Sequence, residues 1–322
     1  SWKNSLDALY NAAKPRVVAI GGPTATGKTA LSVALAKRFG GEIISADSMQ
    51  IYQGLDVGTA KVTPEEMQGV PHHLVGFLAP EQAFSVADFT TLAGKTITQL
   101  TAQGKLPLVV GGTGLYITSL LNGIGFTPEK VDPAIRQELQ ARLQAEGSQA
   151  LYAELAAVDP GYAAKVHPNN TPRVIRALEL YRATGRKMSA EREAARPAEK
   201  PYRSLCLCLT CRDRTLLYQR IDTRCDRMMQ SGILEEAKLV YDHRDTYRTA
   251  AQAIGYKEFF PYFEGTADLE SCLAHLKQAS RNYAKRQLTW FRHMDGVTWL
   301  DAGAADVRQT ALRLTQDFLS KG

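Results

Sequence analysis

The sequence predicts an α/β protein in which helices flank a parallel β-sheet and an all-helical subdomain interrupts that core. Three short runs rich in β-branched residues, 16–21, 42–46 and 106–110, are each followed by a polar or Gly-rich turn. Helical patterns over residues 30–39 and 86–101 lie between these runs. Short apolar strands that alternate with helices are typical of a parallel sheet.

The polar turns after the three strands are expected to converge. Ligands of parallel sheets bind beyond the carboxyl ends of the strands. The turns begin at Gly22, Asp47 and Gly111. We therefore expect a site at this edge, with Asp47 at the end of a strand beside the strand that precedes Gly22.

The middle of the chain is expected to be helical throughout. Helices are predicted over residues 132–146, 149–158 and 172–184, and no strand-like run interrupts them. The predicted domains are a catalytic core of residues 1–123 and 198–322 and a helical insertion of residues 124–197.

After the insertion, the pattern returns to the core. We expect a strand over 204–210, long helices over 214–241 and 269–294, and a last strand over 297–300. Residues 1–15 have the pattern of a short amphipathic helix.

Composition restricts the class of protein. No apolar run approaches the roughly 20 residues that a membrane span needs, and the first residues lack the apolar stretch of a signal peptide. We expect a cytoplasmic protein with no membrane partner. The net charge of +6 favours a polyanionic partner such as nucleic acid.

Five cysteines are present, an odd number that favours free thiols. Cys208 and Cys211 have the spacing of a metal or redox pair. They also belong to an apolar run, and we favour small buried side chains on a core strand. The adjacent His72 and His73 lack metal-ligand spacing, and we interpret them as structural.

One motif carries the chemistry. The segment after the first strand fits G-x-x-x-x-G-K-[ST] and consists of Gly22, Pro23, Thr24, Ala25, Thr26, Gly27, Lys28 and Thr29. Such a P-loop aims backbone amides and a helix N-terminus at phosphate, while Lys28 adds a charge and the Thr29 hydroxyl suits Mg²⁺. A P-loop NTPase-like core that binds phosphate or pyrophosphate is predicted.

The role of Asp47 has two interpretations. It can cap a turn through its side chain, or it can act as a metal organiser or general base. NTP-hydrolysing P-loop proteins usually carry an Asp after an apolar strand, but Gly111, Gly112 and Thr113 follow the third strand. Asp301 follows the last strand, where we interpret it as the start of a surface loop.

Seven motifs in order resemble the tRNA dimethylallyltransferase family, also called tRNA isopentenyltransferases or IPP transferases. The resemblance covers residues from about 16 to 301. The motifs are GPTATGKT (22–29), ISADSMQIY (44–52), DVGTAK (56–61), GGTGLY (111–116), PRVIRALE (172–179), QAIGYKE (252–258) and AKRQLTWFR (284–292).

The resemblance implies transfer of the dimethylallyl group from dimethylallyl diphosphate to N6 of the adenosine 3′-adjacent to the anticodon in tRNA, with release of pyrophosphate. Asp47 would be the general base. Lys28, the P-loop amides, Mg²⁺ and Thr29 would stabilise the leaving pyrophosphate. Arg220 occupies a further pyrophosphate-contacting position, and Thr113 would contact the reacting oxygen or the tRNA.

The partners implied are tRNA and dimethylallyl diphosphate, and we expect a monomer. The residues expected at the tRNA, besides Asp47 and Thr113, are Ser48, Met49, Gln50, Arg136, Pro172, Arg173, Val174, Ile175, Arg176, Gln252, Ala253, Ile254, Gly255, Tyr256 and Lys257. Lys277, Arg281 and Lys285 recur every four residues and could form either a basic stripe for RNA or a solvated helix face.

Three alternatives remain at this point. A small-molecule kinase would turn over ATP, and a nucleotide-gated RNA-binding protein would not need Asp47. A prenyltransferase that acts on free AMP or ADP would need no large clamp, so the helical insertion favours a macromolecular substrate.

Overall fold

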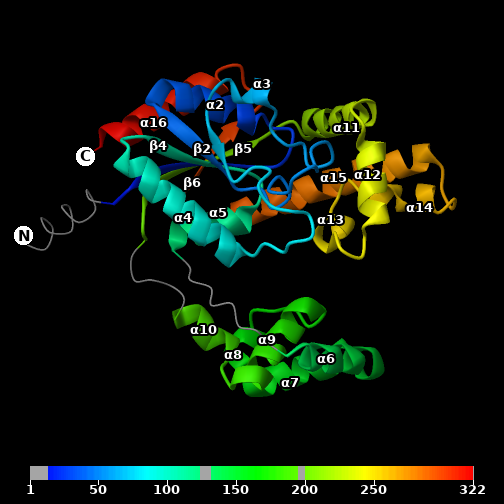
Figure 1. The fold of residues 1–322 in the computed structure, drawn as a ribbon. Helices are drawn as coiled ribbons and strands as arrows, with labels where there is room; N and C mark the ends of the chain where they lie inside the picture. Colours follow the sequence, from blue (N-terminus) through cyan, green and yellow to red (C-terminus); the bar gives the residue numbers. More distant parts are fainter. Residues whose placement is uncertain (1–13, 124–131, 195–199, 322) are drawn as a thin grey trace, which may run out of the picture. The chain divides into compact units, whose positions relative to one another are not determined.

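The computed structural model describes residues 14–123, 132–194 and 200–321. Within them, six parallel strands form one sheet in the order β3-β2-β4-β1-β5-β6 (Figure 1). The strands are β1 (Arg16–Gly21), β2 (Gly41–Ser45), β3 (His72–His73), β4 (Leu106–Val110), β5 (Arg203–Thr210) and β6 (Val297–Asp301). The predicted α/β class with a parallel sheet is confirmed. The helix expected over residues 1–15 falls almost wholly outside the described residues.

The helices that accompany the sheet come from both parts of the core. They are α2 (Lys28–Phe39), α3 (Pro64–Met67), α4 (Val86–Ala102), α5 (Gly114–Asn122), α11 (Arg214–Gln230), α12 (Ile233–Asp242), α13 (Arg248–Gln252), the 3₁₀ helix η1 (Lys257–Phe259), α14 (Phe260–Phe263), α15 (Leu269–Arg292) and α16 (Val307–Ser320). Helix α16 was not among the elements predicted from the sequence.

Two apolar layers hold the helices on the sheet. On one face, Ile20 and Leu207 pack with Leu35 of α2 and Ala311 of α16. On the other face, side chains of β1, β4 and β5 pack with α4, α5 and the end of α15. Figure 1 shows α2 and α16 on one side of the sheet and α4 and α5 on the other. The strand ends that precede the loops are thereby fixed from both sides.

The chain divides into two compact units, residues 1–121 with 200–322 and residues 122–199. The boundaries lie within a few residues of the expected ones. The second unit contains α6 (Pro133–Glu146), α7 (Ser148–Val158), α8 (Pro160–Ala163), α9 (Thr171–Thr184) and α10 (Met188–Ala194). It has an apolar core of its own, which includes Leu139, Leu155 and Leu178.

Two predictions about the core were wrong. The helix expected over 214–241 is two helices, because Gly232 adopts a left-handed conformation with φ 97° between α11 and α12. Strand β2 is not beside β1, because β4 lies between them, with Ile20 opposite Val110 in one pair and Ile43 opposite Leu108 in the other. The Gly-rich turn after β4 is therefore the immediate neighbour of the P-loop.

The three cysteines around β5 are buried free thiols, which confirms their interpretation as core residues. His73 belongs to the edge strand β3, and its Nε2 lies 2.8 Å from Oε1 of Glu42. None of the described helices combines the length and the apolar character that crossing a bilayer requires.

Candidate active site

The P-loop connects β1 to the first turn of α2. Gly22 has φ 133°, and a Cβ atom there would approach the carbonyl oxygen of Leu209 to 2.4 Å, so this position requires glycine. Ala25 and Gly27 also have positive φ angles, 65° and 83°. The hydroxyl group of Thr26 donates to the carbonyl oxygen of Pro23 at 2.7 Å and closes the loop on itself. The loop is thus a preformed cradle of backbone amides.

Lys28 extends back along this cradle. Its Nζ donates to the carbonyl oxygens of Gly22 and Pro23 at 2.8 and 2.7 Å. Burial, and next the neighbouring positive charge of Arg224, lower the pKa of Lys28 to about 7, although the negative charge of Asp47 acts in the opposite direction. The lysine therefore sits where an additional negative charge would strongly favour its protonated form.

The structure is compatible with both interpretations of Asp47, as the cap of a turn and as a general base. Oδ1 accepts hydrogen bonds from the backbone amides of Met49 and Gln50 at 2.8 and 3.1 Å, which is the turn-capping role. Oδ2 makes no hydrogen bond to any described residue, so one oxygen is held and the other remains a proton acceptor.

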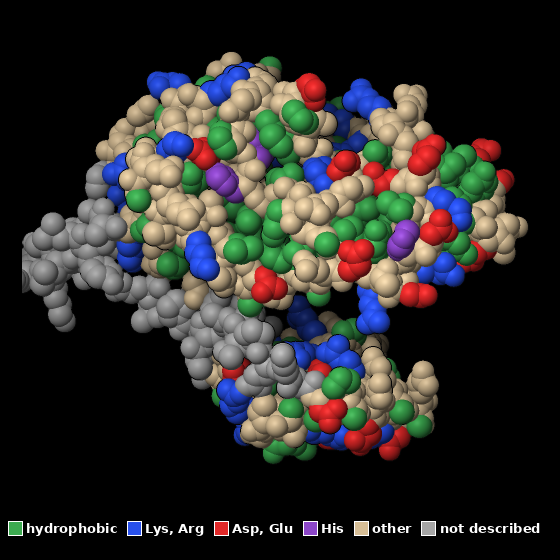
Figure 2. Space-filling model, viewed as in Figure 1, with side chains coloured by type: hydrophobic (Ala, Val, Ile, Leu, Met, Phe, Trp, Pro, Cys, Tyr) green, Lys and Arg blue, Asp and Glu red, His purple; other side chains and the backbone are tan. Residues whose placement is uncertain are grey.

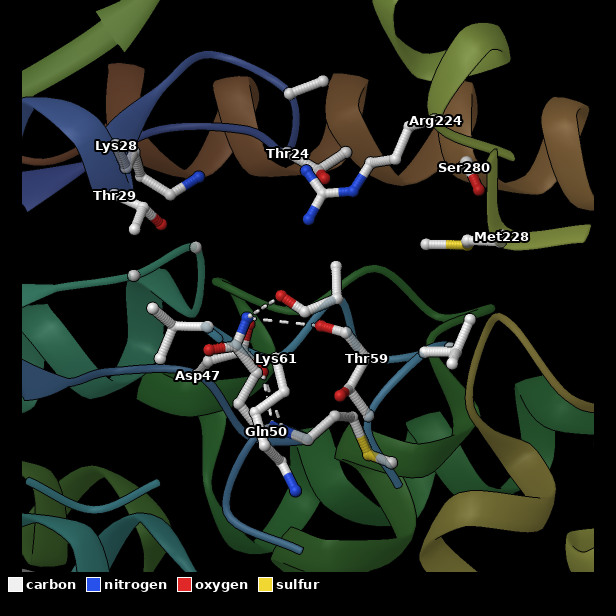
Figure 3. Close-up of a pocket in the computed structure, with 18 of the residues that line it drawn as sticks. Thr24, Lys28, Thr29, Asp47, Gln50, Thr59, Lys61, Arg224, Met228 and Ser280 are labelled. Carbon is white, nitrogen blue, oxygen red and sulfur yellow. Dashed lines mark hydrogen bonds between the residues drawn. The ribbon is translucent and has the colours of Figure 1, made fainter. Parts of the chain in front are cut away.

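Asp47 and the P-loop line the same cleft, whose volume is about 1700 Å³. Figure 3 shows Lys28, Thr29, Thr24 and Arg224 on one side of it and Asp47 and Gln50 on the other. The residues that line it belong to the core unit. The expected convergence of the loops after β1, β2 and β4 is therefore found, with Gly111 and Gly112 between the other two.

Helix α11 contributes three arginines to the cleft, Arg220, Arg224 and Arg227. Arg220, the expected one, lines it, and Nη1 lies 3.8 Å from the sulfur of Cys211. Arg224, one turn later, was missed by the sequence predictions. Its guanidinium points toward Thr24 in Figure 3, and burial lowers its pKa while the charge of Asp47 opposes that shift. The four-residue spacing after Arg220, which places both on one helix face, was the available signal.

Thr113 does not line the cleft. Its Oγ1 accepts a hydrogen bond from the backbone amide of Ser48 at 3.1 Å, and its own amide donates to Ala46 at 3.2 Å. Thr113 thus holds the backbone on both sides of Asp47, through Ala46 and Ser48. This arrangement favours a supporting role for Thr113 over the expected contact with the reacting oxygen or the tRNA.

Several residues expected at the tRNA on the core unit do line the cleft. These are Ser48, Met49, Gln50, Gln252, Ala253, Ile254 and Lys257. Gln50 differs from expectation, because its Nε2 donates to the carbonyl oxygens of Thr59 and Ala60 and so holds the 56–61 loop. Tyr256 is fully buried and Gly255 is buried beside it, which rules out base stacking by Tyr256.

The arginines expected at the tRNA in the helical unit share one carboxylate. Arg136 and Arg176 lie 2.7 and 3.4 Å from Oε2 of Glu179, whose side chain is 6% exposed, whereas the arginine side chains are 49% and 44% exposed. Arg173 and Pro172 are exposed at the start of α9. A buried carboxylate thus holds two guanidinium groups at the surface.

Val174 and Ile175 are placed differently. Both are buried in the core of the helical unit. Their side chains pack inside that unit and are not available to RNA. The prediction that these two side chains contact tRNA was therefore wrong.

The basic stripe on α15 is largely neutralised. Lys277 pairs with Asp226 at 2.7 Å and Arg281 pairs with Asp222 at 2.6 Å, both on α11. On the face shown in Figure 2, basic and acidic side chains are interspersed over the core unit. Lys277 and Arg281 therefore join α15 to α11, whereas Nζ of Lys285 lies 5.6 Å from the centroid of the Tyr218 ring. The role of the stripe in RNA binding stays a prediction.

The protein groups around Thr29 could bind a magnesium ion only together with a bound phosphate compound. The Thr29 side chain lines the cleft beside Lys28. The described residues hold no group of three or more His, Cys, Asp or Glu side chains that could bind a metal ion by themselves. A Mg²⁺ ion here would take most of its ligands from phosphate oxygens and water, which is how this ion is usually bound beside phosphates.

The fold and the cleft define a P-loop protein whose phosphate cradle faces a carboxylate. The family model for IPP transferase matches residues 50–294, and that for isopentenyl transferase matches residues 15–75. The chain belongs to the IPP transferase family.

Individual relatives agree with this assignment. A tRNA dimethylallyltransferase of Bacillus subtilis is 51% identical over 90% of this chain and 92% of its own. The crystal structure of a full-length tRNA isopentenylpyrophosphate transferase from Bacillus halodurans is 45% identical, with a TM-score of 0.71 over 96% of this chain and 97% of that one. A eukaryotic dimethylallyltransferase crystallised acting on tRNA is 32% identical, with a TM-score of 0.79 over 95% of this chain and 80% of that one.

Proposed function

We propose that the protein transfers the dimethylallyl group of dimethylallyl diphosphate to N6 of the adenosine on the 3′ side of the anticodon in tRNA. The observation that carries this proposal is the opposition of Asp47 and the P-loop across one cleft. A P-loop kinase usually also needs a Mg²⁺-organising Asp after an apolar strand, and Gly111 and Gly112 follow β4 instead. A carboxylate that faces the cradle suits a reaction in which a weakly acidic amine loses a proton as a diphosphate leaves.

The residues divide the chemistry between them. The bond from C1 of the dimethylallyl group to the diphosphate oxygen breaks, and its electron pair leaves with the diphosphate. The P-loop amides, Lys28 and Arg224 stabilise that charge. The lone pair of N6 forms the new bond to C1, and its proton passes to Oδ2 of Asp47. Pyrophosphate and the prenylated adenosine are the products.

Thr29 and the diphosphate would hold Mg²⁺, which supplies further charge neutralisation when bound. Magnesium and dimethylallyl diphosphate are both part of this proposal. The cradle supports them through the types of donor it presents, since backbone amides, a lysine and a threonine hydroxyl are the usual partners of a magnesium-bound phosphate.

The tRNA would enter the cleft as an unstacked base. A base inside a stacked stem cannot present N6 to a carboxylate, so the target adenosine must leave its stack. Exposed Arg173 and the pair held by Glu179 supply cations for loop phosphates. A monomer in the cytoplasm, where tRNA is available, completes the proposal.

The test is incubation of the protein with radiolabelled dimethylallyl diphosphate, Mg²⁺, unmodified tRNA, AMP and ATP, followed by nucleoside analysis and an assay of ATP hydrolysis. Label in the adenosine beside the anticodon is expected, with one pyrophosphate released per transfer. Label in free AMP but not in tRNA would favour the adenylate prenyltransferase, and ATP turnover without prenylation would favour a kinase. Either result would overturn the proposal.

A further inference from the structure

Gln287 of α15 joins two loops of the cleft with a single amide. Its Oε1 accepts a hydrogen bond from the backbone amide of Thr24 at 3.3 Å, and its Nε2 donates to the carbonyl oxygen of Gly112 at 3.1 Å. The residue is 7% exposed. Because Thr24 offers a donor and Gly112 an acceptor, only an amide in this orientation satisfies both.

The connection continues to the far side of the cleft. Thr113 follows Gly112 and accepts the hydrogen bond from the amide of Ser48, which in turn follows Asp47. Beside the backbone hydrogen bonds from Gly111 to Ile20 and from Thr113 to Ala46, this side-chain path runs from the phosphate cradle through Gln287 and two adjacent residues to the Asp47 segment. No other side chain among the described residues forms hydrogen bonds to both the P-loop and the turn after β4.

The turn that accepts this amide is tightly packed. A Cβ atom at Gly112 would lie 2.3 Å from Nε2 of Gln287, so a glycine is needed for the close approach. Thr24, Gly112 and Gln287 also line the cleft. The amide of Gln287 thus fixes two backbone groups at the cleft itself. A buried amide elsewhere in the core would fix groups far from the cleft.

We propose that Gln287 is a positioning residue, which sets the distance between the diphosphate cradle and the Asp47 carboxylate. This inference rests on the proposed function. Transfer requires C1 and N6 to meet in line with the leaving oxygen, and a misplacement of about 1 Å can slow such a step roughly 10²-fold. Diphosphate binding depends on the cradle, and RNA binding depends on the other side of the cleft and on the helical unit, so neither requires an exact distance between the two sides.

The first experiment compares Gln287→Met with wild type and with Gln278→Met. Gln278 is an exposed residue of the same helix, outside the cleft, so its substitution should leave kcat unchanged. Gln287→Met preserves side-chain volume and removes both hydrogen bonds. We expect kcat to fall about 10- to 100-fold, with the KM for dimethylallyl diphosphate and the Kd for tRNA within about threefold of wild type. A kcat within twofold of wild type would overturn the inference.

The second experiment remains decisive if Gln287→Met fails to fold. In Gln287→Glu, an ionised carboxylate accepts from Thr24 but repels the Gly112 carbonyl, whereas the protonated acid can accept from one and donate to the other. The ratio of its kcat to that of wild type should therefore rise as the pH falls. A ratio independent of pH would contradict a positioning role. If the wild-type chain forms no prenylated tRNA, the proposed function has failed, which is distinct from either result.

Discussion

The hydroxyl group of Tyr256 donates a hydrogen bond to the carboxylate of Glu236 at 2.6 Å. The same carboxylate accepts the backbone amides of Val57 and Gly58 at 3.0 Å. A Cβ atom at Gly58 would lie 2.6 Å from the Tyr256 ring, so loop and tyrosine are in close contact. Glu236 therefore fastens one wall of the cleft, the 56–61 loop, to helix α12.

This relationship predicts unequal effects of two substitutions. Tyr256→Phe removes one donor and should lower the free energy of unfolding by about 1 kcal/mol. Glu236→Ala leaves two backbone amides and a buried hydroxyl without their acceptor, and the loss should be about 2–3 kcal/mol. Urea denaturation measures both values. If Glu236→Ala were no less stable than Tyr256→Phe, the carboxylate would not be the centre of this contact.

Asp47→Asn separates the two roles of Asp47. An asparagine can retain the acceptor that caps the turn at Met49 and Gln50, but its amide cannot take the proton of N6. We expect the rate of transfer in single-turnover experiments to fall at least about 10²-fold, with tRNA affinity and thermal stability near those of wild type. Asp47→Ala should show the same loss of rate and also a loss of stability. A near-normal rate for Asp47→Asn would remove this residue from the chemistry.

Lys28 should take up a proton when the cradle is filled. With a pKa of about 7, it is mostly neutral at pH 8 in the free protein, and a bound pyrophosphate raises that pKa by its negative charge. Calorimetric titration with magnesium pyrophosphate in two buffers of different ionisation enthalpy should show greater proton uptake at pH 8 than at pH 6. Lys28→Arg, which stays protonated, provides the reference; equal uptake in both proteins would contradict the prediction.

The lowered pKa of Lys28 also makes the free energy of unfolding depend on pH. The unfolded chain, in which the lysine has a pKa near 10.5, binds more protons than the folded one above pH 7. The contribution of Lys28 to stability therefore rises with pH between about 7 and 10.5. Lys28→Met should remove this dependence in urea denaturation of the protein without ligand.

Glu179→Gln tests whether the helical unit uses placed arginines or only positive charge. The substitution makes the unit more positive, which by charge alone would strengthen RNA binding. We expect weaker binding of tRNA, by about 3- to 10-fold, because Arg136 and Arg176 lose the buried carboxylate that orders them. The comparison is Lys277→Ala, whose lysine is paired with Asp226 and should change the Kd less than twofold. Tighter binding by Glu179→Gln would favour charge alone.

The sequence was sufficient wherever a pattern is local. A run of apolar residues predicted strand β4, and the Asp132–Pro133 cap predicted the start of helix α6. The P-loop is identified by its motif, and Asp47 by its place after a strand. The strand order was not recoverable, because pairing between β4 and β1 depends on contacts that no single segment encodes. The break at Gly232 was overlooked because the apolar periodicity continues across it.

The site residues divide in the same way. Arg224 and Gln287 lie on helices distant in sequence from the P-loop, and only tertiary packing brings them to it. Val174, Ile175 and Tyr256 were expected at the RNA because they belong to family motifs, but a motif also contains the residues that pack behind a surface. Burial distinguishes the two kinds of residue, and burial depends on the neighbours that the fold supplies.

The place of β1 in the sheet bears on the order in which the protein can fold. Arg16 pairs opposite Arg203, a residue that emerges only after the whole helical unit has been synthesised. The contacts of that unit are local in sequence, so it can become compact early, whereas the sheet must wait for β5 and β6. Because distant contacts slow folding, the exposed edge of β1 should make the nascent core a substrate for chaperones until β5 pairs with that edge.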